Sequence, residues 1–166
     1  VNIDDVELFG PPPSLAPAGP ARERYEARIG FIGTRIGAHQ LGYNVTAISP
    51  GKRAFPFHNH RVNEEMFFVL AGRGEIRIGL DRHPVRAGDF IACLAGGPET
   101  AHQIVNTGDE ELRFLAVSTM RSPEVAEYPD TGRFGLLAHL DGADGQTRQL
   151  RFVGREEDSL DYWEGA

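Results

Sequence analysis

The chain has 166 residues, of which 40% are hydrophobic, and it carries a formal net charge of −7. This length corresponds to about one domain at ~100–200 residues per domain, and no apolar run approaches the ~20 residues that span a bilayer. The acidic balance and the scattered arginines argue against a nucleic-acid partner, and the single cysteine, Cys93, excludes an intramolecular disulfide. We therefore expect a cytoplasmic protein that contacts neither membranes nor nucleic acid.

Residues 1–24 are predicted to form an extended N-terminal arm. Five prolines, at positions 11, 12, 13, 17 and 20, interrupt this segment and disfavour a helix. From Tyr25 onwards, short apolar runs alternate with turn-forming residues. Residues 25–166 are therefore predicted to form a single β-domain that follows the arm.

Eight apolar-rich runs in this domain have the length and composition of β-strands. Breaks that contain glycine or proline, such as Pro50-Gly51 and Gly72-Arg73-Gly74, separate these runs, and helical periodicity is weak throughout. The pattern predicts an all-β barrel or sandwich. The predicted strands cover residues 27–35, 42–49, 54–60, 65–70, 75–78, 90–94, 102–106 and 112–119.

Residues 120–166 have a looser pattern. Pro123, Pro129 and a stretch rich in Gly and Asp predict loops, with two further strands at 134–140 and 149–153. The final apolar side chains, Leu160, Tyr162 and Trp163, are expected to dock on the domain.

A pair of histidines carries the chemistry of this sequence. His58 and His60 stand one residue apart, so in a strand both imidazoles point to the same face. The next strand begins at Glu64-Glu65, and a third histidine, His102, opens a later strand. Three imidazoles and a carboxylate suit a divalent ion such as Mn, Fe, Co, Ni or Zn.

The spacing of these residues resembles the two motifs of the cupin family. The first motif is resembled by Gly51, six residues, His58-Asn59-His60, four residues, Glu65, six residues and Gly72. The second motif is resembled by Gly88-Asp89-Phe90, then Ala95-Gly96-Gly97, then His102, three residues and Asn106. The resemblance covers residues 42–119 and implies a single-domain double-stranded β-helix, also called a jelly roll.

The resemblance implies one divalent metal per chain, with His58, His60, Glu65 and His102 as ligands. Two alternatives stay open at this point. The first is a buried His-x-His pair that holds no metal, since some cupins have lost their ligands. The second is Glu64 in place of Glu65, because even spacing from His60 would place Glu64 on the histidine face if the strand continued unbroken.

The strand that begins at Glu65 also predicts the lining of the pocket. Phe67 and Val69 share the face of Glu65, and Ile104 follows His102 with the same spacing. Tyr43 and Gln103 are polar candidates for the same pocket, whereas Cys93 is expected to be a small core residue and Asn106 a turn residue. A mostly apolar pocket favours a small, partly apolar or aromatic oxygenated substrate over a highly charged one.

Four protein ligands on an octahedral metal would leave two positions for a substrate or dioxygen. The main hypothesis is a metal-dependent enzyme of the oxidoreductase type, similar to a dioxygenase. The alternatives are a metal-dependent isomerase or lyase, and a non-catalytic sensor or ligand-binding cupin. The opposite strand face, formed by Met66, Phe68 and Leu70, is also apolar, and cupins commonly dimerise, so we expect a homodimer.

Overall fold

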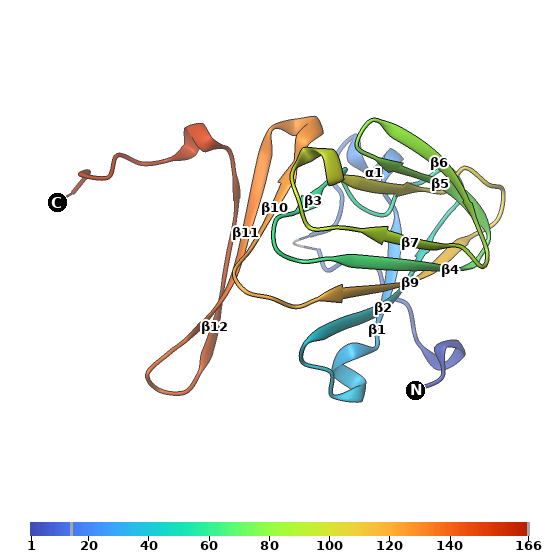
Figure 1. Ribbon diagram of the computed structural model, residues 1–166, viewed down its shortest axis with the longest axis horizontal. Coiled ribbons are helices and arrows are strands. Elements are labelled where there is room, and N and C mark those ends of the chain that lie inside the picture. The colour runs from blue at the N-terminus through green and yellow to red at the C-terminus, as the bar shows by residue number, and fades with distance from the viewer. Residues whose placement is uncertain (14, 166) are drawn as a thin grey trace.

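The structure, a computed structural model, describes residues 1–13 and 15–165. Ser14 in the predicted arm and Ala166 at the end of the predicted domain lie outside the described residues. Within them the chain forms twelve strands in three antiparallel sheets (Figure 1). The strands are β1 (Ala27–Phe31), β2 (Leu41–Ile48), β3 (Asn59–His60), β4 (Glu65–Ala71), β5 (Arg73–Ile78), β6 (Asp81–Arg86), β7 (Phe90–Cys93), β8 (His102–Val105), β9 (Leu112–Thr119), β10 (Glu124–Tyr128), β11 (Arg133–Asp141) and β12 (Thr147–Gly154).

The largest sheet has the strand order β1-β2-β9-β4-β7 and supplies one wall of the barrel. Its register places Phe31, Asn44, Ala116 and Phe67 opposite one another across four strands. Opposite residues in antiparallel strands point to the same face, so these side chains share the inner surface of the barrel.

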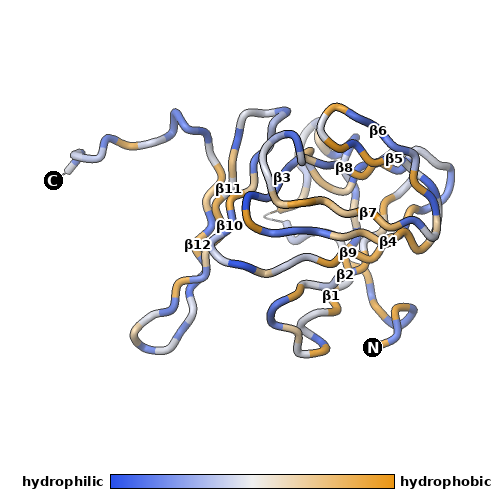
Figure 2. The backbone as a smooth tube through the Cα atoms, viewed as in Figure 1, coloured by the Kyte–Doolittle hydropathy of each residue, from blue (hydrophilic) through white to orange (hydrophobic). Residues whose placement is uncertain are grey.

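The three-stranded sheet β6-β5-β8 supplies the other wall. Ile76 and Ile104, directly opposite each other in β5 and β8, belong to the same buried cluster as Phe67, Val69 and Phe114 of the first sheet. The two sheets therefore enclose one hydrophobic core. Orange segments gather on the barrel strands in Figure 2, and bluer segments gather at the turns between them.

The third sheet has the order β12-β11-β10-β3 and stands beside the barrel, at the left in Figure 1. The short strand β3 belongs to this sheet and carries His60. The third sheet therefore joins the predicted metal ligands to a long hairpin formed by β11 and β12.

Helical structure is limited to short turns in the described part of the chain. The helix α1 covers Ala21–Arg24, and 3-10 turns occupy Ile3–Asp5, Gly33–Ile36, Pro98–Thr100, Pro129–Thr131 and Glu156–Asp158. No helix among residues 1–13 and 15–165 is long and apolar enough to cross a membrane.

The arm packs against the first strand of the barrel. Phe9 N donates to Ile29 O at 3.0 Å, and Ile29 N donates to Phe9 O at 2.8 Å. Val6 is buried at 7% exposure. A Cβ added to Gly30 would lie 2.8 Å from Glu7 O and 2.9 Å from the Leu8 side chain, so the close approach of the arm depends on this glycine.

The all-β double-stranded β-helix and most of its strands are confirmed. The predicted strand at 27–35 ends at Phe31, where the chain enters a 3-10 turn that Gly37 closes with positive φ. The predicted strand at 54–60 is reduced to Asn59–His60, because Pro56 has no N–H to donate to a ladder. Strands β6 and β10 were missed.

The expected docking of the last apolar side chains is wrong. Leu160, Tyr162 and Trp163 are 80%, 87% and 74% exposed. Tyr162 and Trp163 pack edge to face on each other, with ring centroids 4.9 Å apart. Apolar composition predicts a tendency to be buried, but it does not specify which surface provides the burial.

Candidate metal centre

Direct backbone pairing brings two of the predicted ligands together. His58 N donates to His102 O at 3.2 Å, and His102 N donates to His58 O at 2.7 Å, which forms an isolated antiparallel bridge. Residues paired in this way point to the same face. The two imidazole centroids accordingly lie 4.7 Å apart.

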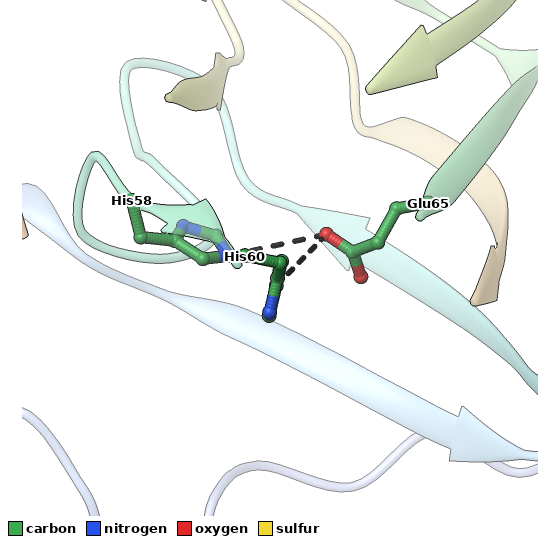
Figure 3. Close-up of side chains that lie close together, drawn as sticks. All are labelled: His58, His60 and Glu65. Atoms are coloured by element: carbon green, nitrogen blue, oxygen red, sulfur yellow. Dashed lines mark ion pairs between the residues drawn. The ribbon is translucent and has the colours of Figure 1, made fainter. Parts of the chain in front are cut away.

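Glu65 is the point at which the three histidines meet. Its Oε2 atom lies 2.9 Å from Nε2 of His102 and 3.3 Å from Nε2 of His60. The Nε2 atom of His58 lies 4.0 Å from the same oxygen. Figure 3 shows how His58 and His60, from the segment before the turn, approach the carboxylate at the start of β4.

This donor set fits a divalent metal. Ligand atoms of His58, His60 and Glu65 lie within 4.8 Å of one another, and His102 joins them through its contact with Glu65. Imidazole nitrogens combined with a carboxylate oxygen suit borderline divalent ions such as Mn, Fe, Co, Ni and Zn. A His58/His60/Glu65 triad could therefore hold a metal ion, with His102 as the fourth candidate ligand.

The second ring nitrogen of each histidine faces an oxygen behind the centre. His58 Nδ1 lies 2.8 Å from Pro56 O, and His102 Nδ1 lies 3.4 Å from Thr100 O. A proton on Nδ1 that is donated to such an oxygen leaves Nε2 with a free lone pair for a metal. The backbone therefore favours the tautomer that a ligand needs.

His60 has a carboxylate in this position instead of a carbonyl. Its Nδ1 atom is buried and has no hydrogen-bond partner among the described residues, yet Glu124 Oε2 lies only 3.7 Å away. Glu124 is itself 6% exposed and accepts hydrogen bonds from Val62 N at 3.2 Å and Asn63 N at 2.8 Å. These bonds hold the carboxylate behind His60.

Burial and the neighbouring charges tune the ionisation of the centre. Burial, reinforced by the charges of His102 and His60, lowers the pKa of His58 to about 4. Burial alone would raise the pKa of Glu65, but hydrogen bonds from His102 and His60 hold it well below its usual range. Glu65 is thus an anion and His58 a neutral imidazole at pH 7, as metal ligation requires.

A cavity of about 300 Å³ opens over the four side chains. Thr46 Oγ1 donates to Asn44 Oδ1 at 2.8 Å, and Gln103 Nε2 donates to Phe55 O at 2.7 Å, so the polar groups of the lining are held in place. The rest of the wall is mainly apolar and includes Ile29, Phe31, Ala54, Phe67, Ile104, Phe114 and Ala116.

The lining agrees with the sequence-based expectation at three positions and differs at two. Phe67, Ile104 and Gln103 line the cavity. Val69 is 1% exposed and packs in the hydrophobic core instead. Tyr43 is absent from the lining, because Asn44 and Thr46 of the same strand point inward and side chains alternate along β2.

Three further predictions concern residues around the centre. Glu65 lines the cavity, whereas Glu64 is exposed at the entry to β4. Cys93 is a buried core residue, as expected, and burial raises the pKa of its thiol to about 12. Asn106 is buried in its turn, where its side chain accepts from Gly108 N and donates to Ile48 O.

Sequence reasoning missed Glu124, Asn44 and Thr46. Glu124 follows Pro123 in a stretch predicted as loops, and nothing in the sequence indicated that it would lie beside His60. Asn44 and Thr46 could have been found, because they alternate with the buried Val45 in a predicted strand.

Comparisons with known proteins agree with this geometry. Residues 44–118 match the family model described as the cupin domain. A crystal structure of a sugar phosphate isomerase from a cupin superfamily, from Silicibacter pomeroyi, is 25% identical and has a TM-score of 0.75, over 99% of this chain and 97% of that one. A structure from Acidithiobacillus ferrooxidans, provisionally named a sugar phosphate isomerase, is 27% identical with a TM-score of 0.61, over 75% and 76% of the two chains.

Among the relatives found by sequence, Protein SchB of Streptomyces halstedii is 29% identical over 132 residues, which cover 80% of this chain and 82% of that protein. The oxalate-binding protein of Thermotoga maritima is 37% identical over 60 residues, which cover 36% of this chain and 47% of that protein. The chain spans about half the length of two of the curated relatives it matches, 55% of one and 47% of the other.

Proposed function

The chain is a cupin-domain protein with a double-stranded β-helix fold, and we propose that it is a metal-dependent isomerase of a small oxygenated substrate, in particular a sugar phosphate. The observation that carries the proposal is the convergence of three histidine Nε2 atoms on one Glu65 oxygen at the base of the cavity. One divalent ion per chain, bound there, would act as a Lewis acid on a substrate carbonyl or hydroxyl.

The surrounding residues would orient the substrate and keep water out. Phe67, Ile104 and Phe114 form an apolar wall that lowers the local dielectric constant. The amide of Asn44 and the hydroxyl of Thr46 are fixed on the same sheet face as Phe67 and Phe114, where they can hydrogen-bond to substrate hydroxyls. Few polar groups on an apolar wall are typical of sites that fix the orientation of a small ligand.

The comparisons support an isomerase better than a dioxygenase. Two similar structures, which cover 99% and 75% of this chain, carry the names of sugar phosphate isomerases, and neither is named as a dioxygenase. The fold alone hosts many chemistries, so the reaction has to be assayed directly.

The test is an isomerase assay on protein loaded separately with Mn, Fe, Co, Ni and Zn. Interconversion of aldose and ketose phosphates is followed by NMR while dioxygen is recorded with an electrode. Metal-dependent interconversion without oxygen uptake supports the proposal. Substrate-dependent oxygen uptake with Fe(II) would favour the dioxygenase alternative instead. Glu65→Gln should abolish turnover, and Glu64→Gln, which changes an exposed neighbour, should retain it.

A second candidate function is non-catalytic binding of a small dicarboxylate. The match to the oxalate-binding protein favours this candidate. Oxalate bound without turnover, at a site that requires the metal and Glu65, would support it. If sugar phosphates are neither bound nor converted under the same conditions, the isomerase proposal is refuted.

A further inference from the structure

A second cleft opens beside the candidate metal centre. Its volume is about 600 Å³, and it shares Ile29, Phe31 and Phe55 with the wall of the metal cavity. The N-terminal arm forms one side of this cleft, through Phe9, Gly10, Pro11, Pro12, Leu15 and Ala16. The third sheet forms the other side. A molecule held at the metal could therefore extend directly into this outer cleft.

Strand register explains which side chains of the third sheet face the outer cleft. His60 lies opposite Ala126 of β10, and Tyr128, two residues on, lies opposite Arg133 of β11. Residues at even spacing along a strand, and their cross-strand partners, share one face. The sheet face that carries the candidate ligand His60 therefore also carries Tyr128 and Arg133.

The same rule extends to the last strand. Gly135 lies opposite Val153, and Leu137 lies opposite Arg151, so Arg151 and Arg133 share this face. Both arginines line the outer cleft, together with Tyr128, whose ring centroid lies 6.3 Å from that of His58. One continuous sheet surface thus leads from the metal ligands to two guanidinium groups.

Arg133 and Arg151 face no carboxylate among the described residues of the outer cleft. They are the only charged side chains among the described residues that line the outer cleft. Within residues 1–13 and 15–165, neither forms an ion pair, and the side chain of Arg133 makes one hydrogen bond, from its Nε to the hydroxyl of Thr131 at 3.2 Å. Of the other fourteen arginines, eight likewise form no ion pair in the described part of the chain, and six pair with carboxylates, namely Arg28, Arg61, Arg73, Arg77, Arg82 and Arg155.

Two guanidinium groups that line one cleft with no carboxylate among its described lining residues, in a chain of net charge −7, indicate a site for an anion. We propose that Arg133 and Arg151 bind the phosphate group of a phosphate monoester whose oxygenated end reaches the metal centre. Guanidinium groups bind phosphate oxygens through paired, charge-assisted hydrogen bonds. The apolar residues shared by the two cavities would contact the carbon chain between the two ends. This inference rests on the proposed function, which supplies the role of the metal end.

The test measures binding of ribose 5-phosphate, ribose and inorganic phosphate by calorimetry, on the full chain with and without added metal. In the metal-free protein, ribose 5-phosphate should bind and ribose should not. Arg133→Gln and Arg151→Gln should each weaken ribose 5-phosphate binding about tenfold, since each removes a charge-assisted contact. The measurement on metal-free protein is needed because a bound metal ion would itself attract phosphate.

Arg148→Gln is the matched control. Arg148 lies on β12, three residues from Arg151, and odd spacing places it on the opposite face, across from Leu140. The substitution Arg148→Gln removes the same charge as Arg151→Gln from the same strand and should leave ribose 5-phosphate binding unchanged. Circular dichroism of all three variants shows whether each has folded.

The outcomes separate this inference from the proposed function. Arginine-dependent phosphate binding in a protein that neither binds metal nor isomerises sugar phosphates would support the phosphate site and refute the metal-dependent isomerase. Metal-dependent turnover that is unaffected by Arg133→Gln and Arg151→Gln would overturn the phosphate site alone. Equal loss of affinity with Arg148→Gln would also overturn it, because the effect would then be one of overall charge. Inorganic phosphate that competes with ribose 5-phosphate identifies the phosphate group as the part recognised.

Discussion

At the scale of single residues, Glu65 is the carboxylate on which the centre depends. Its Oε2 atom is the common neighbour of the three histidine Nε2 atoms, whereas Glu64 is exposed. Glu65→Gln should therefore remove most of the bound metal, because a neutral amide is a weaker ligand than a carboxylate. Glu64→Gln should retain it. Metal content measured by mass spectrometry after dialysis checks both, and the reverse pattern would assign the ligand to Glu64.

Glu124 should act on the metal through His60. Its carboxylate lies 3.7 Å from His60 Nδ1 and is fixed by the backbone N–H groups of Val62 and Asn63. Carboxylates behind a ligating histidine typically contribute 10- to 100-fold in metal affinity. Glu124→Gln should therefore weaken metal binding by about tenfold or more in a chelator competition assay. Glu64→Gln serves as the control, and equal affinities would show that Glu124 only holds the loop.

Acid should release the metal through the histidines. The pKa of His60 is raised, since the hydrogen bond and charge of Glu65 and the charge of Glu124 outweigh burial, so His60 takes up a proton early as pH falls. Glu65, with a pKa well below its usual range, stays ionised. A protonated imidazole cannot ligate, so metal occupancy should fall below about pH 6. Occupancy that stays flat from pH 8 to pH 5 would argue against histidine ligands.

At the scale of elements, turn residues and alternation predicted most of the barrel, and the failures have physical causes. Strand β6 contains Pro84, which indicated a turn; β6 is an edge strand, where a missing N–H is tolerated. Strand β10 lies between Pro123 and Pro129, and its five residues give only a short alternation of apolar and polar side chains. Tyr43 was assigned to the pocket because the sequence indicated its strand but not which alternate side chains of that strand face the cavity.

The contact between the arm and β1 gives a prediction at this scale. A Cβ at position 30 would lie 2.8 Å from Glu7 O, so Gly30→Ala must displace the arm or the strand. The cost should be about 1–3 kcal/mol of unfolding free energy, typical of overpacking. Urea denaturation measures it, and faster proteolysis of the arm should accompany it.

Gly10→Ala provides the control within the same arm. A Cβ at Gly10 would meet nothing within 4 Å, so this variant should unfold close to the wild-type urea concentration. Equal stability of both variants would show that the arm does not depend on the close approach at Gly30.

At the scale of the whole molecule, the sequence could predict the metal centre but not the outer cleft. The candidate ligands follow two local motifs, and backbone pairing of His58 with His102 joins those motifs. The outer cleft instead combines the arm with β11 and β12, segments at opposite ends of the described chain. No local spacing relates Phe9 to Arg151, so only the folded arrangement reveals that they line one cleft.

The outer face of the five-stranded sheet bears on the expected homodimer. Register places Phe90 opposite Phe68, and Phe68 opposite Leu115, on the face that points away from the metal cavity. The rings of Phe68 and Phe90 lie 4.4 Å apart, yet Phe90 is 72% exposed. A contiguous apolar sheet face of this kind is typical of an interface between subunits.

We therefore expect a homodimer that buries this face in solution. Light scattering at micromolar concentration should give about twice the chain mass of 18.2 kDa. Phe90→Glu should shift the mass toward that of one chain, because dimerisation would bury an unpaired carboxylate. Arg86→Glu, an exposed position on the edge strand β6, is the control for added negative charge and should leave the dimer intact. A wild-type mass of one chain would refute the homodimer, and a dimer that persists in Phe90→Glu would place the interface on another surface.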